Sequence, residues 1–166
     1  MLQQPLFKPD TEINNVLREW WKSLENNKGD RAALRRCHQT AQVLFVPAYH
    51  ELCVKLRQHG RLKAEQLPAV AGLLAHVKKD IDKELPKQMA TPKTAGGEPV
   101  LSELRFRRLL QCQSQEELFP ALRRVVRLLD GNVNLYSLAE SVYWWGHADW
   151  GERVRQHWAY AYYEST

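Results

Sequence analysis

Apolar residues recur every three to four positions along most of this chain, and no other feature limits its possible folds so strongly. A period of about 3.6 residues is typical of amphipathic helices, whereas a half-buried strand alternates with a period of two. The chain shows no sustained alternation of that kind, so the sequence predicts an all-α protein without a sheet. The apolar stripes lie within residues 13–24, 34–44, 47–56, 67–81, 106–110, 118–129, 135–145 and 150–162.

Residues that favour helix starts precede several of these stripes. Side chains with an oxygen acceptor at the N-cap satisfy free N–H groups of the first turn. Ser114 and Glu117 also have the spacing of a capping box, which predicts a helix start at that point. The other predicted N-caps are Asp10 or Thr11 for the first helix, Asp30 for the second and Asn134 for the helix over 135–145.

The helical pattern is interrupted between Pro86 and Pro99, where the chain holds three prolines and two glycines. Proline and glycine at this density are typical of a connecting loop. We therefore predict two packed small helical bundles, residues 1–85 and 101–166, joined by a linker loop over 86–100.

Positive charge is concentrated in two blocks. The net charge is +5, and residues 31–63 carry seven basic side chains against one acidic one. Residues 101–130 add a net +2, mostly from arginines spaced three or four apart on two successive predicted helices. Such spacing places the arginines of one helix on one face, where they repel each other unless a polyanion binds. The pattern favours a phosphate-binding surface over a solvated helix flank, and a membrane surface is the weaker alternative. The arginines of these two helices are Arg105, Arg107, Arg108, Arg123, Arg124 and Arg127.

No known catalytic motif is present. The chain contains no P-loop, no Gly-x-Ser-x-Gly and no dinucleotide-binding fingerprint. Cys37-His38 and His50-x-x-Cys53 could suggest a metal site, but their spacing matches no common zinc pattern and both cysteines lie on apolar stripes. We therefore expect buried thiols, no catalytic residue, no cofactor and no metal. A metal-dependent helical hydrolase stays open as an alternative.

The cellular compartment follows from equally simple features. Three cysteines leave at least one unpaired, and the N-terminal MLQQPLFKPD lacks the pattern of a signal peptide. No apolar run reaches the roughly 18 residues that a membrane span needs. These features predict a cytoplasmic protein.

Aromatic residues gather at the C-terminal end, where nine of the sixteen lie between Tyr136 and Tyr163. Stacking on nucleic-acid bases is one interpretation. Most of these rings, however, recur at helical spacing together with Leu, Val or Ala, which is typical of a small helical core. We therefore expect most of them in the core.

An ordered set of short motifs resembles CasB, the small subunit of the type I-E CRISPR Cascade complex. The similarity extends over nearly the whole chain, although Gly146-His147-Ala148-Asp149 stands where some relatives carry a basic run. The matching motifs are Trp20-Trp21-x-x-Leu24, Asp30-Arg31-x-x-Leu34-Arg35-Arg36, Val70-Ala71-Gly72-Leu73-Leu74-Ala75, Ser102-Glu103-x-Arg105-Phe106-Arg107-Arg108-Leu109-Leu110, Leu122-Arg123-Arg124 and Trp144-Trp145-Gly146.

The resemblance implies a non-catalytic, all-helical subunit that is present as two copies in an RNA-guided complex. Its implied partners are other Cascade subunits, the CRISPR guide RNA and the target and displaced DNA strands. By motif match, backbone contacts are implied for Arg31, Arg35, Arg36, Arg105, Arg107 and Arg108. Arg123 and Arg124 also lie within a matching motif.

A helical protein–protein adaptor with an incidental basic surface is the main alternative function.

Overall fold

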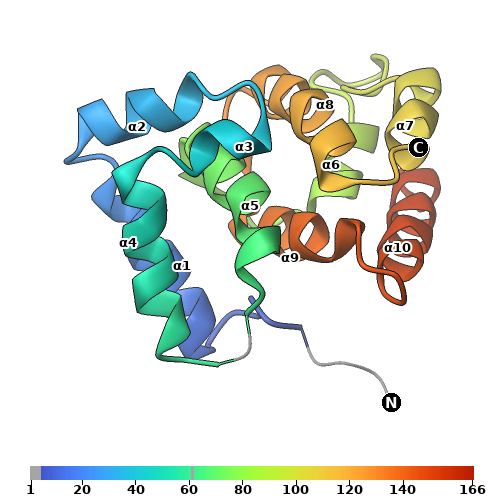
Figure 1. Cartoon of the computed structure of the whole chain (residues 1–166). Helices are drawn as coiled ribbons and strands as arrows, with labels where there is room; N and C mark the ends of the chain where they lie inside the picture. Colours follow the sequence, from blue (N-terminus) through green and yellow to red (C-terminus); the bar gives the residue numbers. More distant parts are fainter. Residues whose placement is uncertain (1–4, 61) are drawn as a thin grey trace.

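The computed structural model describes residues 5–60 and 62–166, and within these residues helices form almost all of the regular structure (Figure 1). The prediction of an all-α fold is confirmed. The first half contains α1 (Glu12–Ser23), α2 (Lys28–Arg35), α3 (Thr40–Val43), α4 (Pro47–Arg57), a short 3-10 helix η1 (Ala64–Gln66) and α5 (Leu67–Leu74). The second half contains α6 (Leu85–Ala90), α7 (Glu103–Leu110), α8 (Gln115–Leu128), α9 (Leu135–Trp145) and α10 (Gly151–Glu164).

One short sheet departs from the sequence prediction. Strand β1 (Lys79–Asp80) pairs in parallel with β2 (Asn132–Val133). The apolar stripe over 67–81 had predicted a helix across this region, but α5 ends at Leu74. Strands of two residues are too short to show an alternating pattern, and their pairing joins segments that are distant in sequence. The prediction of no sheet was therefore wrong at this point.

Helix α5 lies at the centre of the molecule, and all eight of its residues are buried. It packs against α2, α3, α4, α8 and α9 (Figure 1). Gly72 permits the close approach of α8, since a Cβ atom there would lie 2.8 Å from the ring of Phe119. The two halves of the chain thus share one continuous hydrophobic core.

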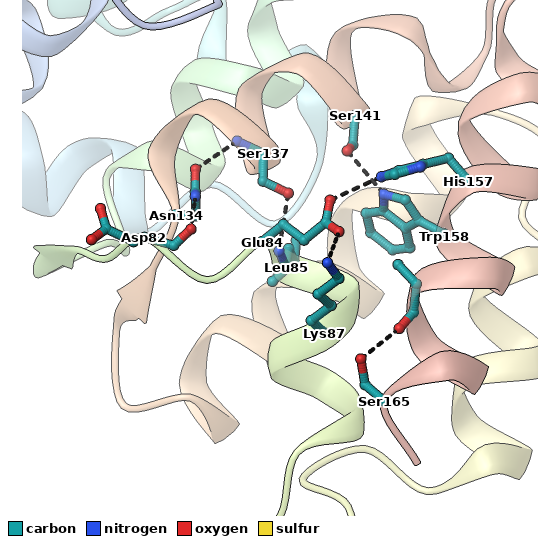
Figure 2. A network of polar contacts seen from close by, with 11 residues as sticks. Asp82, Glu84, Leu85, Lys87, Asn134, Ser137, Ser141, His157, Trp158 and Ser165 are labelled. Carbon is teal, nitrogen blue, oxygen red and sulfur yellow. Dashed lines mark hydrogen bonds and ion pairs between the residues drawn. The ribbon is translucent and has the colours of Figure 1, made fainter.

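Polar contacts connect α6 with α9 and α10 beside this core (Figure 2). The Glu84 carboxylate contacts His157 Nε2 at 2.8 Å and Lys87 Nζ at 3.2 Å. The backbone N–H of Leu85 donates to Ser137 Oγ at 3.0 Å. Because these contacts pair charged and polar groups of the segment at the start of α6 with groups of α9 and α10, we interpret the network as structural: it fixes α6 against α9 and α10.

The start of the segment predicted as a linker loop is helical. Residues 86–90 belong to α6, and Met89 and Ala90 are completely buried. Pro86 lies in the first turn of α6, where proline is tolerated because no backbone donor is needed there. Residues 93–98 are exposed, and they lie between Pro92 and Pro99, which pair in an isolated bridge. The division into two bundles stays a prediction.

Several helix ends agree with the capping residues of the sequence. The side chains of Thr11, Ser114 and Asn134 each accept a backbone hydrogen bond in the first turn of α1, α8 and α9. The prediction was wrong for the second helix, which starts at Lys28 and ends at Arg35 instead of continuing along the stripe to Leu44. Leu44 is 46% exposed, so it does not belong to the core.

The C-terminal aromatic residues are mostly in the core, as predicted. Trp145 packs edge-to-face against Trp158, and both are completely buried. Tyr160 and Tyr163 are exposed exceptions on α10. The buried members are Tyr143, Trp144, Trp145, Trp158 and Tyr162.

No helix within the described residues combines the length and the apolar character required to cross a bilayer.

Candidate nucleic-acid interface

Two arginines of α2 bind carbonyl groups at the C-terminal end of α5 and in the segment that follows it. Arg31 donates from Nε to Ala75 O and from Nη2 to Val77 O, both at 3.3 Å. Arg35 donates from Nε to Ala75 O at 2.8 Å. The last carbonyls of a helix have no partner within the helix and carry partial negative charge, so cations stabilise them. These contacts hold both guanidinium groups beside the carbonyl of Ala75.

Arg123 reaches the same place from α8. Its Nη2 donates to the backbone carbonyl of Arg35 at 3.2 Å, and its Nε donates to His76 Nε2 at 3.4 Å. Its Nη1 lies 2.9 Å from His38 Nδ1. One guanidinium thereby connects α8 with α2, with the segment after α2 and with the segment after α5.

We call Arg31, Arg35, His76, Arg123 and Arg127 the α2–α8 cluster. Burial is the main cause that lowers the pKa of His76, and the four arginines lower it further, to about 4. The His76 ring is therefore neutral near pH 7. Burial and then Arg31 lower the pKa of Arg35, while burial and then Arg127 lower that of Arg123.

The positive charge of the cluster is not balanced by carboxylates. Among the described residues, none of its four arginines forms an ion pair with an aspartate or a glutamate. Guanidinium groups bind phosphate oxygens through paired hydrogen bonds, and a bound anion would relieve the repulsion between them. The arrangement is therefore chemically suited to an anion.

The remaining predicted arginines are exposed and lie around or away from the cluster. Arg36 and Arg124 follow Arg35 and Arg123 directly, on the exposed sides of α2 and α8. Helix α7 lies at the other end of the molecule from α2, with α8 between them (Figure 1). It is attached there by Phe106, whose ring stacks on Tyr162 of α10 at 3.9 Å. The exposed arginines of α7 are Arg105, Arg107 and Arg108.

Comparison with known protein families gives a match. The family model of CRISPR-associated protein Cse2 matches residues 30–163, which include all nine predicted arginines. The chain belongs to the Cse2 family. The match confirms the resemblance to CasB, and it identifies the chain as a subunit of the type I-E CRISPR Cascade complex. No individual curated protein and no solved structure matches the chain significantly.

Sequence reasoning missed two residues at this site of the Cse2-family chain. His76 and Lys78 were not among the predicted contacts, yet His76 accepts from Arg123 and Lys78 lines the same pocket as Arg35 and Arg127. Their basic character was visible in the sequence. Their position was not, because it depends on how the segment after α5 packs between α2 and α8.

The candidate metal ligands do not converge in this Cse2-family chain. His38 contacts Arg123, whereas His50 Nε2 lies 2.7 Å from the carbonyl oxygen of Leu44. Cys37 and Cys53 are buried and unpaired, as predicted for core thiols. In the described part of the chain, no group of three or more His, Cys, Asp or Glu residues is arranged to hold a metal ion.

Proposed function

We propose that this Cascade subunit binds the backbones of the guide RNA, the target strand and the displaced strand through its basic helix faces. The convergence of the α2 and α8 arginines around His76, without a carboxylate partner in the described part of the chain, is the observation that carries this proposal. Backbone phosphates supply most of the affinity of nucleic-acid binding, and arginine suits them by charge and geometry.

The proposed mechanism is stabilisation of the R-loop. Exchange of a DNA duplex for an RNA–DNA heteroduplex is nearly balanced in free energy, so modest backbone contacts shift it toward the open state. Guide pairing selects the sequence, and this subunit strengthens the complex once pairing begins. We propose that it acts in the cytoplasm in antiviral defence, as two copies per complex, and without catalysis, metal or cofactor of its own.

A reconstituted Cascade complex with Arg124→Ala and Arg127→Ala in this subunit tests the proposal. Both side chains are exposed on α8, so their removal leaves the contacts of Arg123 in place. Arg153→Ala, on the exposed side of α10, is the control for loss of one positive charge away from the cluster, so the effects are compared per charge removed. We expect the double variant to slow target opening and to reduce the log–log salt slope by roughly 0.7 to 0.9 for each lost phosphate contact, while the preferred sequence stays the same.

Opening rates and salt slopes equal to those of the control would overturn the proposed function. The adaptor alternative would then account for the basic surface as incidental.

One observation supports an additional protein-binding role. Phe45 is 86% exposed, and Val54 and Leu44 are 56% and 46% exposed along the same shallow groove. The groove is formed by the turn after α3 and by one side of α4. Exposed apolar groups that lie together commonly mark contacts with other proteins. We propose that this surface contacts a neighbouring Cascade subunit. Phe45→Ser should then reduce incorporation into the complex without changing nucleic-acid binding by the free chain, and unchanged incorporation would contradict this role.

A further inference from the structure

A small polar pocket lies next to the α2–α8 cluster. It has a volume of about 300 Å³ and is bounded by α2, by the segment after α5 and by the C-terminal end of α8. A phosphate group is small enough to enter it. The residues that line it are Arg35, His76, Lys78, Val126, Arg127, Asp130 and Gly131.

Lys78 is held against one wall of this pocket. Its backbone N–H donates to Gly131 O at 2.8 Å, which fixes the start of the side chain. A Cβ atom at Gly131 would lie 2.8 Å from Lys78 Cγ and 3.0 Å from Cδ, so the absence of a side chain leaves room for the lysine stem. Gly131 also has a positive φ of 78°, which glycine adopts without strain. The lysine is thus positioned before any ligand binds.

The two arginines of the pocket keep free donors. Arg35 is fixed through Nε alone, and among the described residues its Nη atoms have no hydrogen-bond acceptor. The Arg127 guanidinium likewise has no acceptor within the described part of the chain. Free donors that border one pocket with a lysine can converge on an anion.

The two other polar side chains of the pocket, His76 and Asp130, already have partners. His76 accepts from Arg123 and is neutral near pH 7, so it adds no further positive charge. Among the residues that the structure describes, Asp130 is the only carboxylate that borders the pocket, and Lys93 Nζ binds it at 2.9 Å. This ion pair weakens the repulsion between Asp130 and an entering anion.

We propose that this pocket binds one phosphate group of a nucleic-acid backbone, with Lys78, Arg35 and Arg127 as its ligands. The inference rests on the proposed function and makes it more specific. It identifies Lys78 as a contact that the arginine pattern did not contain, and it gives one backbone phosphate a defined position in the structure. The surrounding exposed arginines would then bind the phosphates on either side.

The test compares Lys78→Ala with Lys79→Ala in the purified full chain. Both variants lose one positive charge at adjacent exposed positions, but only Lys78 borders the pocket. Binding of a fluorescent single-stranded oligothymidylate is measured by anisotropy across a range of salt concentrations. We expect Lys78→Ala to reduce the salt slope by roughly 0.7, as for one lost phosphate contact to a single strand, and Lys79→Ala to change it much less.

A second pair of variants tests the pocket without altering Lys78. Asp130→Asn removes the carboxylate at the pocket, and asparagine tolerates the positive φ of 58° found there. Asp149→Asn, at an exposed position before α10, makes the same change of charge away from the pocket. We expect Asp130→Asn to tighten oligothymidylate binding severalfold more than Asp149→Asn does.

The outcomes separate this proposal from the proposed function. If the wild-type chain binds with a clear salt dependence but Lys78→Ala equals Lys79→Ala, or Asp130→Asn equals Asp149→Asn, the pocket is not a phosphate site and the proposed function stands. If neither the wild-type chain nor the complex that contains it shows salt-dependent binding through this subunit, the proposed function fails as well. Unfolding midpoints of the variants show whether each change acts through the pocket or through stability.

Discussion

Arg123 on α8 donates a hydrogen bond to the backbone carbonyl of Arg35 on α2 at 3.2 Å, which connects two residues of the same charge. Two cations approach each other here because backbone carbonyls and a neutral histidine accept their hydrogen bonds, and no carboxylate of residues 5–60 or 62–166 pairs with either of them. The structure thereby holds positive charge at a junction of helices and leaves it available to an external anion.

Replacement of Arg123 should cost stability as well as binding. Arg123→Ala removes the hydrogen bonds of the guanidinium to Arg35 O, His76 and His38, so these acceptors lose their donor. We expect the free energy of unfolding to fall by about 1 to 3 kcal/mol. Chemical denaturation of the free chain measures this. Arg124→Ala, the exposed neighbour, should stay within about 0.5 kcal/mol of wild type. An equal effect of both substitutions would show that the junction does not stabilise the fold.

Acidification should destabilise the chain through His76. Its pKa is about 4 in the folded state against 6.5 in the unfolded chain, so the unfolded state binds the proton first. The resulting stability is fully present above about pH 6.5 and is lost as the pH falls toward 4. Its loss lowers the free energy of unfolding by an amount on the order of 3 kcal/mol.

Comparison with His76→Gln isolates this effect. The glutamine carbonyl can still accept from Arg123 but does not titrate, so the variant should lose less stability between pH 7 and pH 4.5. An NMR titration of the His76 ring measures the pKa directly. A value near 6.5 would contradict the prediction.

The α7 arginines should act independently of the α2–α8 cluster. Arg105, Arg107 and Arg108 are exposed, so joint replacement by alanine should preserve helicity in circular dichroism. In the reconstituted complex we expect weaker binding of all sequences alike, with a salt slope lower by roughly 0.7 to 0.9 per lost contact. Unchanged binding would restrict the interface to α2, α8 and the segment after α5.

Gly72 should be intolerant of a side chain. Gly72→Ala places a methyl group 2.8 Å from the ring of Phe119 and 3.1 Å from Val43 Cγ2, at the contact between α5 and α8. Overpacking of this kind typically costs about 1 to 3 kcal/mol, which exceeds the gain of up to about 1 kcal/mol in helix propensity. Gly29→Ala in α2 meets no atom within 4 Å and should be neutral or stabilising. Thermal unfolding of both variants distinguishes these effects.

Limited proteolysis should cut the chain within residues 93–98. This segment is exposed, and Lys93 offers a trypsin site there. The two fragments should stay associated in gel filtration, because α5 packs against α8 and α9 and because α6 packs against α10. Faster cleavage elsewhere, or separation of the fragments without denaturant, would contradict the predicted arrangement of two packed bundles.

Local sequence patterns predicted much of the fold. The apolar period located most helices, and Thr11, Ser114 and Asn134 cap the helices that they were expected to cap. Both properties depend on residues within one or two turns of each other, so they can be read without a tertiary structure. The prediction failed at α6, where prolines concealed a short buried helix, and at β1 and β2, whose pairing connects distant segments.

The sequence by itself determined the helical class, the aromatic core, the family and which arginines are present. Only the tertiary structure decided which of these arginines meet. Arg31 and Arg35 join Arg123 because α5 ends between α2 and α8 and offers its free carbonyl groups to them, whereas Phe106 holds α7 against α10. The position of Lys78 also depends on the tertiary structure. The pairing of β1 with β2 brings Lys78 next to Gly131, which has no side chain and so leaves room for the lysine stem. Helical periodicity orients a side chain on its own helix, but the packing of helices determines what that side chain faces.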